Sequence, residues 1–243
     1  MEEMSEVAVR TMPRRGRLWI VAVLALGAIA FGYFVVNYST QKPNNDVIHI
    51  AGIEDAQRVF GGVPQEGDRV GSSDAPVTIQ VFNDLQCSSC QEAYLSTIPA
   101  LVEDYARPGD VQLDWRHYSN AESPEEEGFY GAEAAAEQGY GWQYTYLFFR
   151  NQDEAEKFGV DQTFLETVAG SVEELNFPEW KEDLEKGQSG GPIKKRLEGY
   201  EELGQDLGIR VGQALIVSGP NGTETLQDSP SLAEIEAAIK QVE

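Results

Sequence analysis

Cysteine and histidine are scarce in this 243-residue chain, which has two of each. Cys87 and Cys90 fall within one four-residue window, so they cannot staple distant segments as the cross-links of a disulfide-rich fold do. A zinc site of four nitrogen and sulfur ligands cannot be assembled either, since neither His49 nor His117 stands at ligand spacing. We therefore expect no metal and no other cofactor. The length suffices for one domain with a full hydrophobic core.

Basic residues are also few, 18 against 41 acidic ones, which gives a formal net charge of −23. Such a surface repels nucleic acid and anionic lipid, and we expect no nucleic-acid partner. The simplest interpretation is a solvated acidic surface that aids solubility. A salt-adapted habitat and a basic partner are the alternatives.

Charge is absent from one long run, Leu18 to Tyr38, which is almost wholly apolar. At about 1.5 Å per residue this run is long enough to cross the hydrocarbon core of a bilayer. Four arginines precede it, so the positive-inside rule places the N-terminus in the cytoplasm and the remainder of the chain outside. A cleaved signal peptide is the alternative, because Ala28-Ile29-Ala30 has the small-x-small pattern of a cleavage site.

The sequence thus predicts four segments. They are a cytoplasmic N-terminus over 1–17, a transmembrane anchor over 18–38, a linker over 39–61, and one domain over 62–243. The anchor makes this a single-pass membrane protein whose large domain is extracytoplasmic, where disulfides persist.

Hydrophobic patterning within the domain indicates an α/β fold. The predicted elements are, in order, a strand over 77–82, a helix over 88–105 with Pro99 inside it, a strand over 111–118, a helical block over about 124–204, a strand within 207–218, a returning strand over 223–226 and a helix over 231–242. The first three form a βαβ unit with parallel strands, and the last three form a ββα unit. Together they predict a thioredoxin-like fold with a helical insertion.

Cys87 and Cys90 form a C-x-x-C motif at the start of the predicted helix. A helix N-terminus carries partial positive charge and unpaired N–H groups, which stabilise a thiolate. Cys87 is therefore the expected nucleophile, and Cys90, one turn later, the thiol that resolves a mixed disulfide. A C-x-x-C beside a βαβ pattern favours redox chemistry over half a zinc site.

Three blocks resemble the DsbA-like thioredoxin family, in particular its membrane-anchored bacterial branch. They are Gly62-Val63-Pro64-Gln65-Glu66-Gly67, Gly71 to Thr78 (GSSDAPVT) and Phe82 to Cys90 (FNDLQCSSC). The resemblance covers about 62–243. It implies dithiol–disulfide exchange with the thiols of exported proteins or peptides, and a membrane or extracytoplasmic redox partner that recycles the site.

The family has a Thr-Pro or Val-Pro step before its third strand, with the proline in cis beside the cysteines. Here Gly212 and Gln213 stand at that step, with Gln213 in place of proline. We expect this segment to be the substrate-docking loop. A cis bond before a non-proline residue costs about 3–4 kcal/mol, so a trans Gly212–Gln213 peptide is predicted.

Other side chains have both a structural and a functional interpretation. Asp84 either caps the helix at Cys87 or relays protons to it. His117 is expected to be a packed residue rather than a catalytic one. The aromatic residues Phe82, Trp142, Tyr144, Tyr146, Phe148 and Phe149 predict either core packing or an apolar peptide-binding surface.

Two classes of function follow. The first is a protein thiol–disulfide oxidoreductase that acts through Cys87 and Cys90. The second is a redox-inactive binding module or chaperone on the same fold, in which the Cys87–Cys90 bond is passive. Turnover of a dithiol peptide separates the two.

Overall fold

A computed structural model of the chain describes residues 47–119, 127–210 and 213–243. One compact unit extends from Ile48 to Glu243. It includes residues 48–61, which the sequence analysis assigned to a linker, because the helix α2 (Ile53–Phe60) buries Ala56, Val59 and Phe60. The predicted anchor over 18–38 lies outside the described residues. Within the part that is described, no helix is long and apolar enough to cross a membrane.

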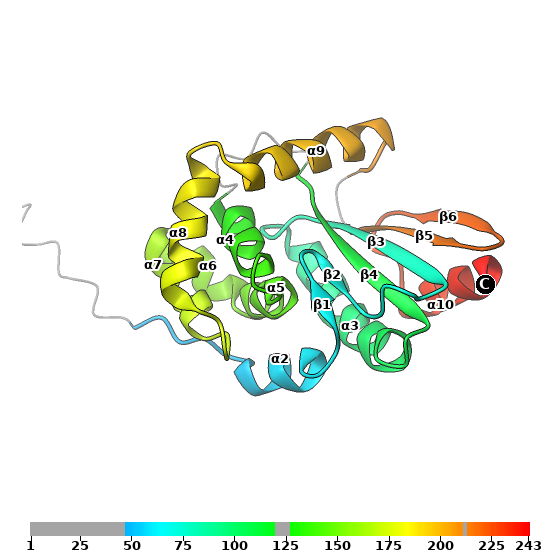
Figure 1. Ribbon diagram of the computed structural model, residues 1–243, viewed down its shortest axis with the longest axis horizontal. Coiled ribbons are helices and arrows are strands. Elements are labelled where there is room, and N and C mark those ends of the chain that lie inside the picture. The colour runs from blue at the N-terminus through cyan, green and yellow to red at the C-terminus, as the bar shows by residue number, and fades with distance from the viewer. Residues whose placement is uncertain (1–46, 120–126, 211–212) are drawn as a thin grey trace, which may run out of the picture. The chain divides into compact units, whose positions relative to one another are not determined.

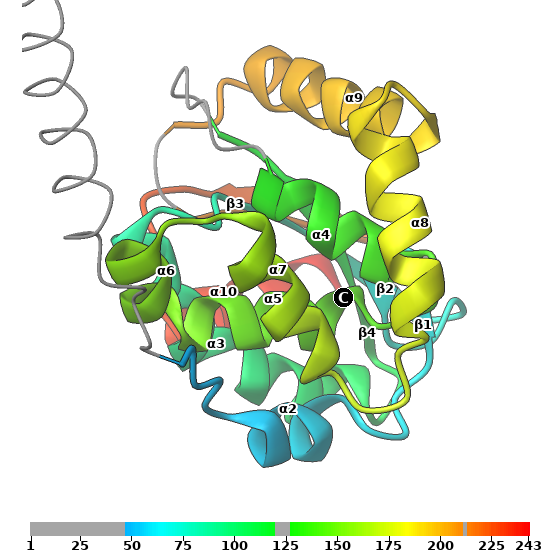
Figure 2. The same ribbon diagram turned by 90° about the vertical axis from the view of Figure 1, so that its left-hand side faces the viewer.

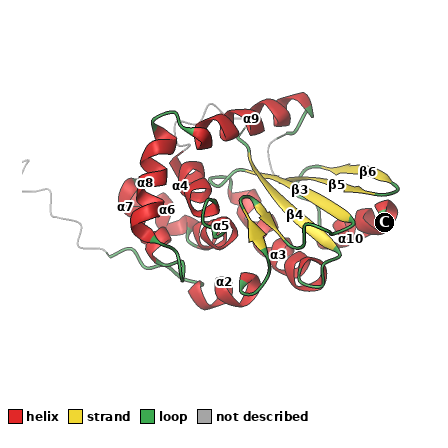
Figure 3. Ribbon diagram, viewed as in Figure 1, coloured by secondary structure: helices red, strands yellow, loops and turns green. Residues whose placement is uncertain are grey.

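A single six-stranded sheet organises the unit, with strand order β1-β2-β4-β3-β5-β6 (Figures 1 and 3). The strands are β1 (Gln65–Glu66), β2 (Arg69–Val70), β3 (Val77–Asn83), β4 (Val111–His117), β5 (Ala214–Gly219) and β6 (Gly222–Leu226). Only β3 and β4 are parallel, as the predicted βαβ unit requires. The two-residue strands β1 and β2 were not predicted, because so short a hairpin has no alternating pattern.

The predicted redox helix becomes two elements, α3 (Ser88–Leu101) and a five-residue π-helix (Val102–Ala106). Pro99 lies inside α3, three residues before the change from α to π hydrogen bonding. The prediction of one continuous helix through to Tyr105 is therefore wrong. The C-terminal helix α10 (Leu232–Val242) starts at a capping box in which Ser231 and Glu234 bond each other reciprocally.

The predicted helical block is an insertion of six helices among the described residues, placed between β4 and β5 (Figure 2). They are α4 (Glu127–Ala136), α5 (Gly141–Arg150), α6 (Gln152–Phe158), α7 (Gln162–Gly170), α8 (Phe177–Gln188) and α9 (Pro192–Asp206). The strand predicted within 207–218 begins only at Ala214. Gly208, in the left-handed conformation at φ 63°, follows the end of α9 and stops the helix.

The two faces of the sheet pack differently. On one face, alternate residues of the strands join a large core with α3, α5 and α10. On the other face, Phe82, Tyr118, Ile209, Ala214 and Ile216 form a smaller cluster that Leu203 of α9 covers. The aromatic residues of α5, with Phe82, are all buried. The predicted core packing is therefore confirmed, and the alternative of an exposed apolar surface is wrong.

Candidate functional site

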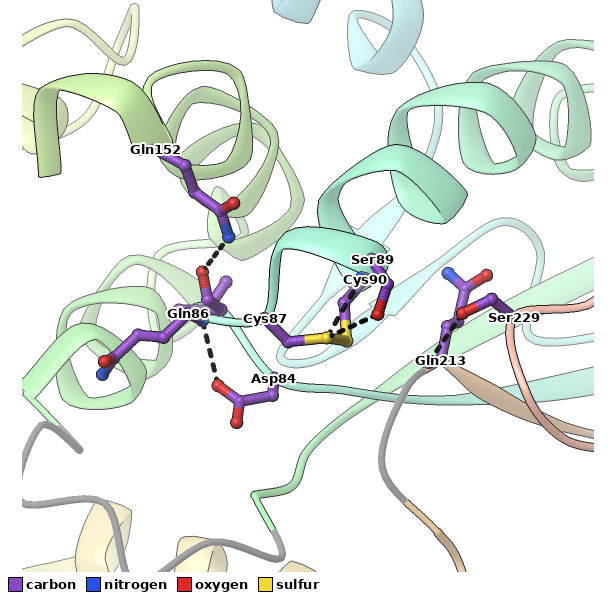
Figure 4. The surroundings of a disulfide bond; sticks show 9 residues. Asp84, Gln86, Cys87, Ser89, Cys90, Gln152, Gln213 and Ser229 are labelled. Atoms are coloured by element: carbon purple, nitrogen blue, oxygen red, sulfur yellow. Dashed lines mark hydrogen bonds between the residues drawn. A yellow bond between two sulfur atoms is a disulfide. The ribbon is translucent and has the colours of Figure 1, made fainter. Parts of the chain in front are cut away.

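The two cysteines lie where β3 gives way to α3, at the carboxyl end of the parallel strands (Figure 4). Cys87 is the N-cap residue of α3, and Cys90 lies in its first turn. The two residues form a disulfide, with their Cα atoms 5.1 Å apart. The buried strand β3 and the helix α3 that follows it thus bring both sulfur atoms to the end of the sheet at which the parallel strands finish.

The environments of the two sulfur atoms differ. Cys90 is fully buried, whereas Cys87 is half-buried. The Cys87 Sγ atom accepts a hydrogen bond from the Cys90 backbone N–H at 3.1 Å and another from the Ser89 hydroxyl at 3.2 Å. When the bond is reduced, these donors and the N-terminus of α3 are in place to stabilise a thiolate on Cys87. Cys87 is therefore the sulfur that a second thiol can both reach and displace.

A short turn before Cys87 sets the position of the motif. The Asp84 carboxylate accepts from the Gln86 backbone N–H at 2.9 Å, and the Asp84 carbonyl accepts from Cys87 N–H at 3.3 Å. The N-cap position of α3 belongs to Cys87 itself, so the predicted helix cap at Asp84 is corrected to a turn that precedes the helix.

The helical insertion holds this turn from the other side. The Gln152 amide of α6 donates to the Leu85 carbonyl, and the Gln91 amide of α3 donates to the Phe149 carbonyl at 2.6 Å. Gln152 is buried, so its bond is shielded from water (Figure 4). The sequence gives no signal for this contact, because Gln152 is one polar residue among several at the start of its helix.

Replacing Gln152 with leucine should destabilise the oxidised protein by about 1–3 kcal/mol, because the Leu85 carbonyl is then buried without its donor. The turn before Cys87 should loosen as well, and disulfide exchange should slow. Denaturant unfolding and exchange with glutathione measure the two effects. Gln162→Leu is the matched control, since Gln162 is exposed, its amide bonds only the half-buried Glu166, and its loss should shift stability by about 0.5 kcal/mol or less. Equal stabilities of the two variants would contradict the prediction.

Gln213 is fully buried and lies beside the disulfide (Figure 4). Its backbone is held by Ser229, whose hydroxyl accepts from Gln213 N–H at 3.3 Å and whose N–H donates to the Gln213 carbonyl at 2.9 Å. Gln213 of the predicted docking loop thus lies near the cysteines, and its docking role stays a prediction. Gly212 lies outside the described residues, so the predicted trans Gly212–Gln213 bond stays a prediction.

A buried charge network lies under the sheet face between β4 and the insertion. The Arg196 guanidinium bonds the Glu133 carboxylate and lies 3.5 Å from Asp68, and His117 Nε2 lies 3.5 Å from Glu133 Oε1. Burial, with the neighbouring Asp68 carboxylate, raises the pKa of Glu133 well above its usual range. Burial lowers the pKa of His117 well below its usual range. His117 is therefore a packed, neutral residue, as predicted.

A cavity of about 10 Å³, with room for about one water molecule, lies beside the network, and its lining includes Asp68, Trp115 and His117. Glu133 was not predicted as a site residue, although a lone carboxylate between Gly131 and the alanines that follow it was a usable signal. Across residues 47–119, 127–210 and 213–243, no group of three or more histidine, cysteine or acidic side chains is arranged to hold a metal ion.

Comparison with known proteins gives the family. The family model described as "Thioredoxin" matches residues 65–200, more than half of the chain. A probable disulfide bond formation protein D of Bacillus cereus is 23% identical over 203 residues, which cover 82% of this chain and 84% of the relative.

Solved structures show the same fold. BdbD of Bacillus subtilis in its oxidised form has a TM-score of 0.61 at 20% identity, covering 74% of this chain and 96% of that one. Alpha-DsbA1 of Wolbachia pipientis has a TM-score of 0.60 at 15% identity, covering 74% and 93%. With the family match over 65–200 and a C-x-x-C disulfide at the N-terminus of α3, this chain belongs to the thioredoxin family.

Proposed function

We propose that this chain is an extracytoplasmic thiol–disulfide oxidoreductase that passes the Cys87–Cys90 disulfide to exported proteins. One observation carries the proposal: the half-buried sulfur of Cys87, at the N-cap of α3, is bonded to the fully buried sulfur of Cys90. The names of the relatives, disulfide bond formation proteins, support disulfide formation as the net direction.

The exchange has two steps. A substrate thiolate attacks Cys87 Sγ, the bond to Cys90 breaks, and Cys90 leaves as a thiolate while a mixed disulfide forms on Cys87. A second substrate thiolate then attacks the substrate sulfur of that mixed disulfide, and Cys87 leaves. The substrate loses two electrons, which the cysteine pair gains. An extracytoplasmic or membrane oxidant then takes these electrons and restores the bond.

Turnover tests the proposal against the alternative of a passive binding module. The oxidised protein, given a reduced dithiol peptide and excess glutathione disulfide, should form many peptide disulfides per protein molecule. A binding module would form none beyond the uncatalysed rate. The aromatic residues that could have formed an apolar binding surface are buried, which favours the enzyme.

The location outside the cytoplasm rests on the arginines before Leu18 to Tyr38 and on the absence of charge within that run. A reporter that is active only outside the cytoplasm, fused after Glu243, should be active. A reporter that is active only inside, fused at the same place, should be silent. The opposite pattern would contradict the predicted topology, and a soluble mature form that begins near Phe31 would show that the apolar run is cleaved.

A further inference from the structure

Three polar residues lie side by side where the carboxyl ends of β3 and β4 meet the start of β5. Asn83 of β3 pairs with His117 of β4. Phe82 pairs with Ala214 of β5, so one step further along the strands Asn83 lies next to Gln213. Asn83 and Gln213 are 1% and 0% exposed. A sheet that is otherwise apolar at this face therefore ends in a row of buried amide and imidazole groups.

This row is on the face that carries the redox helix. Side chains alternate between faces along a strand. Phe82 and Ala214 belong to the smaller cluster on the opposite face, whereas Val81 and Leu215 belong to the core with α3. Asn83 and Gln213, as the next residues in each alternation, share the α3 face.

Cys90 is the residue of α3 that lies over the row. Tyr94, one turn after Cys90, packs edge-to-face on Trp115 of β4 with ring centroids 5.3 Å apart. The helix runs antiparallel to β4, so one turn back along α3 corresponds to about two residues forward along β4, from Trp115 to His117. The buried Cys90 therefore lies at the same level of the sheet as Asn83 and Gln213, and Figure 4 shows Gln213 among the residues around the disulfide.

Both amides lack partners in the oxidised protein. Neither the oxygen nor the nitrogen of the Asn83 and Gln213 side chains has a hydrogen-bond partner among the described residues. His117 differs, since its Nδ1 accepts from the Trp115 indole N–H and its Nε2 faces Glu133. Buried polar atoms without partners are costly, and a native fold that keeps four of them in one place calls for a reason.

We propose that the amides of Asn83 and Gln213 become partners of the Cys90 sulfur when the disulfide is reduced. A disulfide sulfur has no proton to donate and is a weak acceptor. Reduction breaks the S–S bond, adds two electrons and leaves a thiol or thiolate on Cys90. An amide N–H can donate to the thiolate, and an amide oxygen can accept from the thiol. The pair of amides therefore stabilises the reduced form and makes the protein a stronger oxidant.

This inference rests on the proposed function, which it deepens by naming two positioning residues that set the redox equilibrium. It also explains why a polar side chain occupies the end of a buried strand. Gln213 was predicted from the sequence as a docking residue, whereas Asn83 was not predicted as a site residue.

The test is the equilibrium constant of the Cys87–Cys90 pair with glutathione. Asn83→Leu keeps a similar size and removes both polar atoms. It should lower the tendency of the disulfide to be reduced about tenfold, a shift of about 30 mV toward more negative potential. Gln213→Leu should shift the equilibrium in the same direction. Gln143→Leu is the control, because Gln143 also buries an unpartnered amide oxygen, near the start of α5, and should leave the equilibrium unchanged.

The free energy of unfolding of each variant is measured in both the oxidised and the reduced state. This comparison does not depend on how much of each variant folds during preparation. The proposal requires that Asn83→Leu destabilise the reduced form relative to the oxidised form. If both leucine variants keep the wild-type equilibrium constant, or lose the same stability in both redox states, the amides do not act on the Cys90 sulfur and the inference fails. A wild-type protein that does not exchange with glutathione at all would instead refute the proposed function.

Discussion

Replacing Cys87 with alanine should abolish turnover of a dithiol peptide. Cys90→Ala should also stop turnover, because it has no disulfide to pass on, and its Cys87 thiolate should form a mixed disulfide with a peptide disulfide. The reason is the asymmetry of the site. Cys87 is the accessible sulfur at the N-cap of α3, and the buried Cys90 is the protein's own thiol that can attack a mixed disulfide on Cys87, which is the reverse of the first exchange step. Given a peptide disulfide, Cys90→Ala should therefore accumulate a covalent complex through Cys87, with one peptide thiolate as the leaving group; non-reducing electrophoresis detects the complex and a reductant releases it.

Ser88→Ala is the matched control, since Ser88 is exposed within the same motif and its hydroxyl makes no described contact with Cys87. It should retain most of the turnover. Covalent complexes that form with Cys87→Ala, through Cys90, would reverse the assignment of nucleophile and resolving cysteine.

Replacing Trp142 with alanine should destabilise the domain by about 3–5 kcal/mol, because removing the indole leaves a cavity where the insertion packs against the sheet. Trp142 is 1% exposed, packs edge-to-face on Trp115 with ring centroids 5.4 Å apart, and donates from its indole N–H to the Asp68 carbonyl at 3.0 Å. For a domain of this size the melting temperature should fall by about 6–20 °C.

Leu207→Ala provides the comparison, since Leu207 is an exposed apolar residue at 42% and should change stability by about 0.5 kcal/mol or less. Thermal unfolding of both variants in the oxidised state makes the measurement. A Trp142→Ala variant within about 1 kcal/mol of the wild type would show that the insertion does not depend on this contact.

Local pattern was enough to predict the elements that carry the cysteines. The β-branched run over 77–82, the C-x-x-C after it and the alternating run over 111–118 predicted β3, α3 and β4, because each signal lies within a few residues of the element it specifies. The returning strand over 223–226 was predicted in the same way and is β6. These elements fix the place of the redox pair.

The side-chain contacts that hold the cysteine pair in place were not predictable, because they join residues that are far apart in the sequence. Gln152 bonds the Leu85 carbonyl 67 positions away, and Glu133 meets Arg196 63 positions away. Asn83 gave a weak local signal, as a polar residue that ends an apolar strand. Its proposed role depends on its side chain lying on the face of the sheet that α3 covers, which is a tertiary arrangement. The strands β1 and β2 were missed because two residues carry no periodicity.

Alkylation of the reduced protein as a function of pH tests the central assignment most directly. Each cysteine is followed separately by mass spectrometry of the peptides. Cys87 should react first, with a midpoint below the value of about 8.5 that an unperturbed thiol shows, because the N-terminus of α3 and the donors from Ser89 and Cys90 stabilise its thiolate. Cys90, fully buried, should react only slowly. Reaction at Cys90 before Cys87, or a common midpoint near 8.5 for both, would contradict the account.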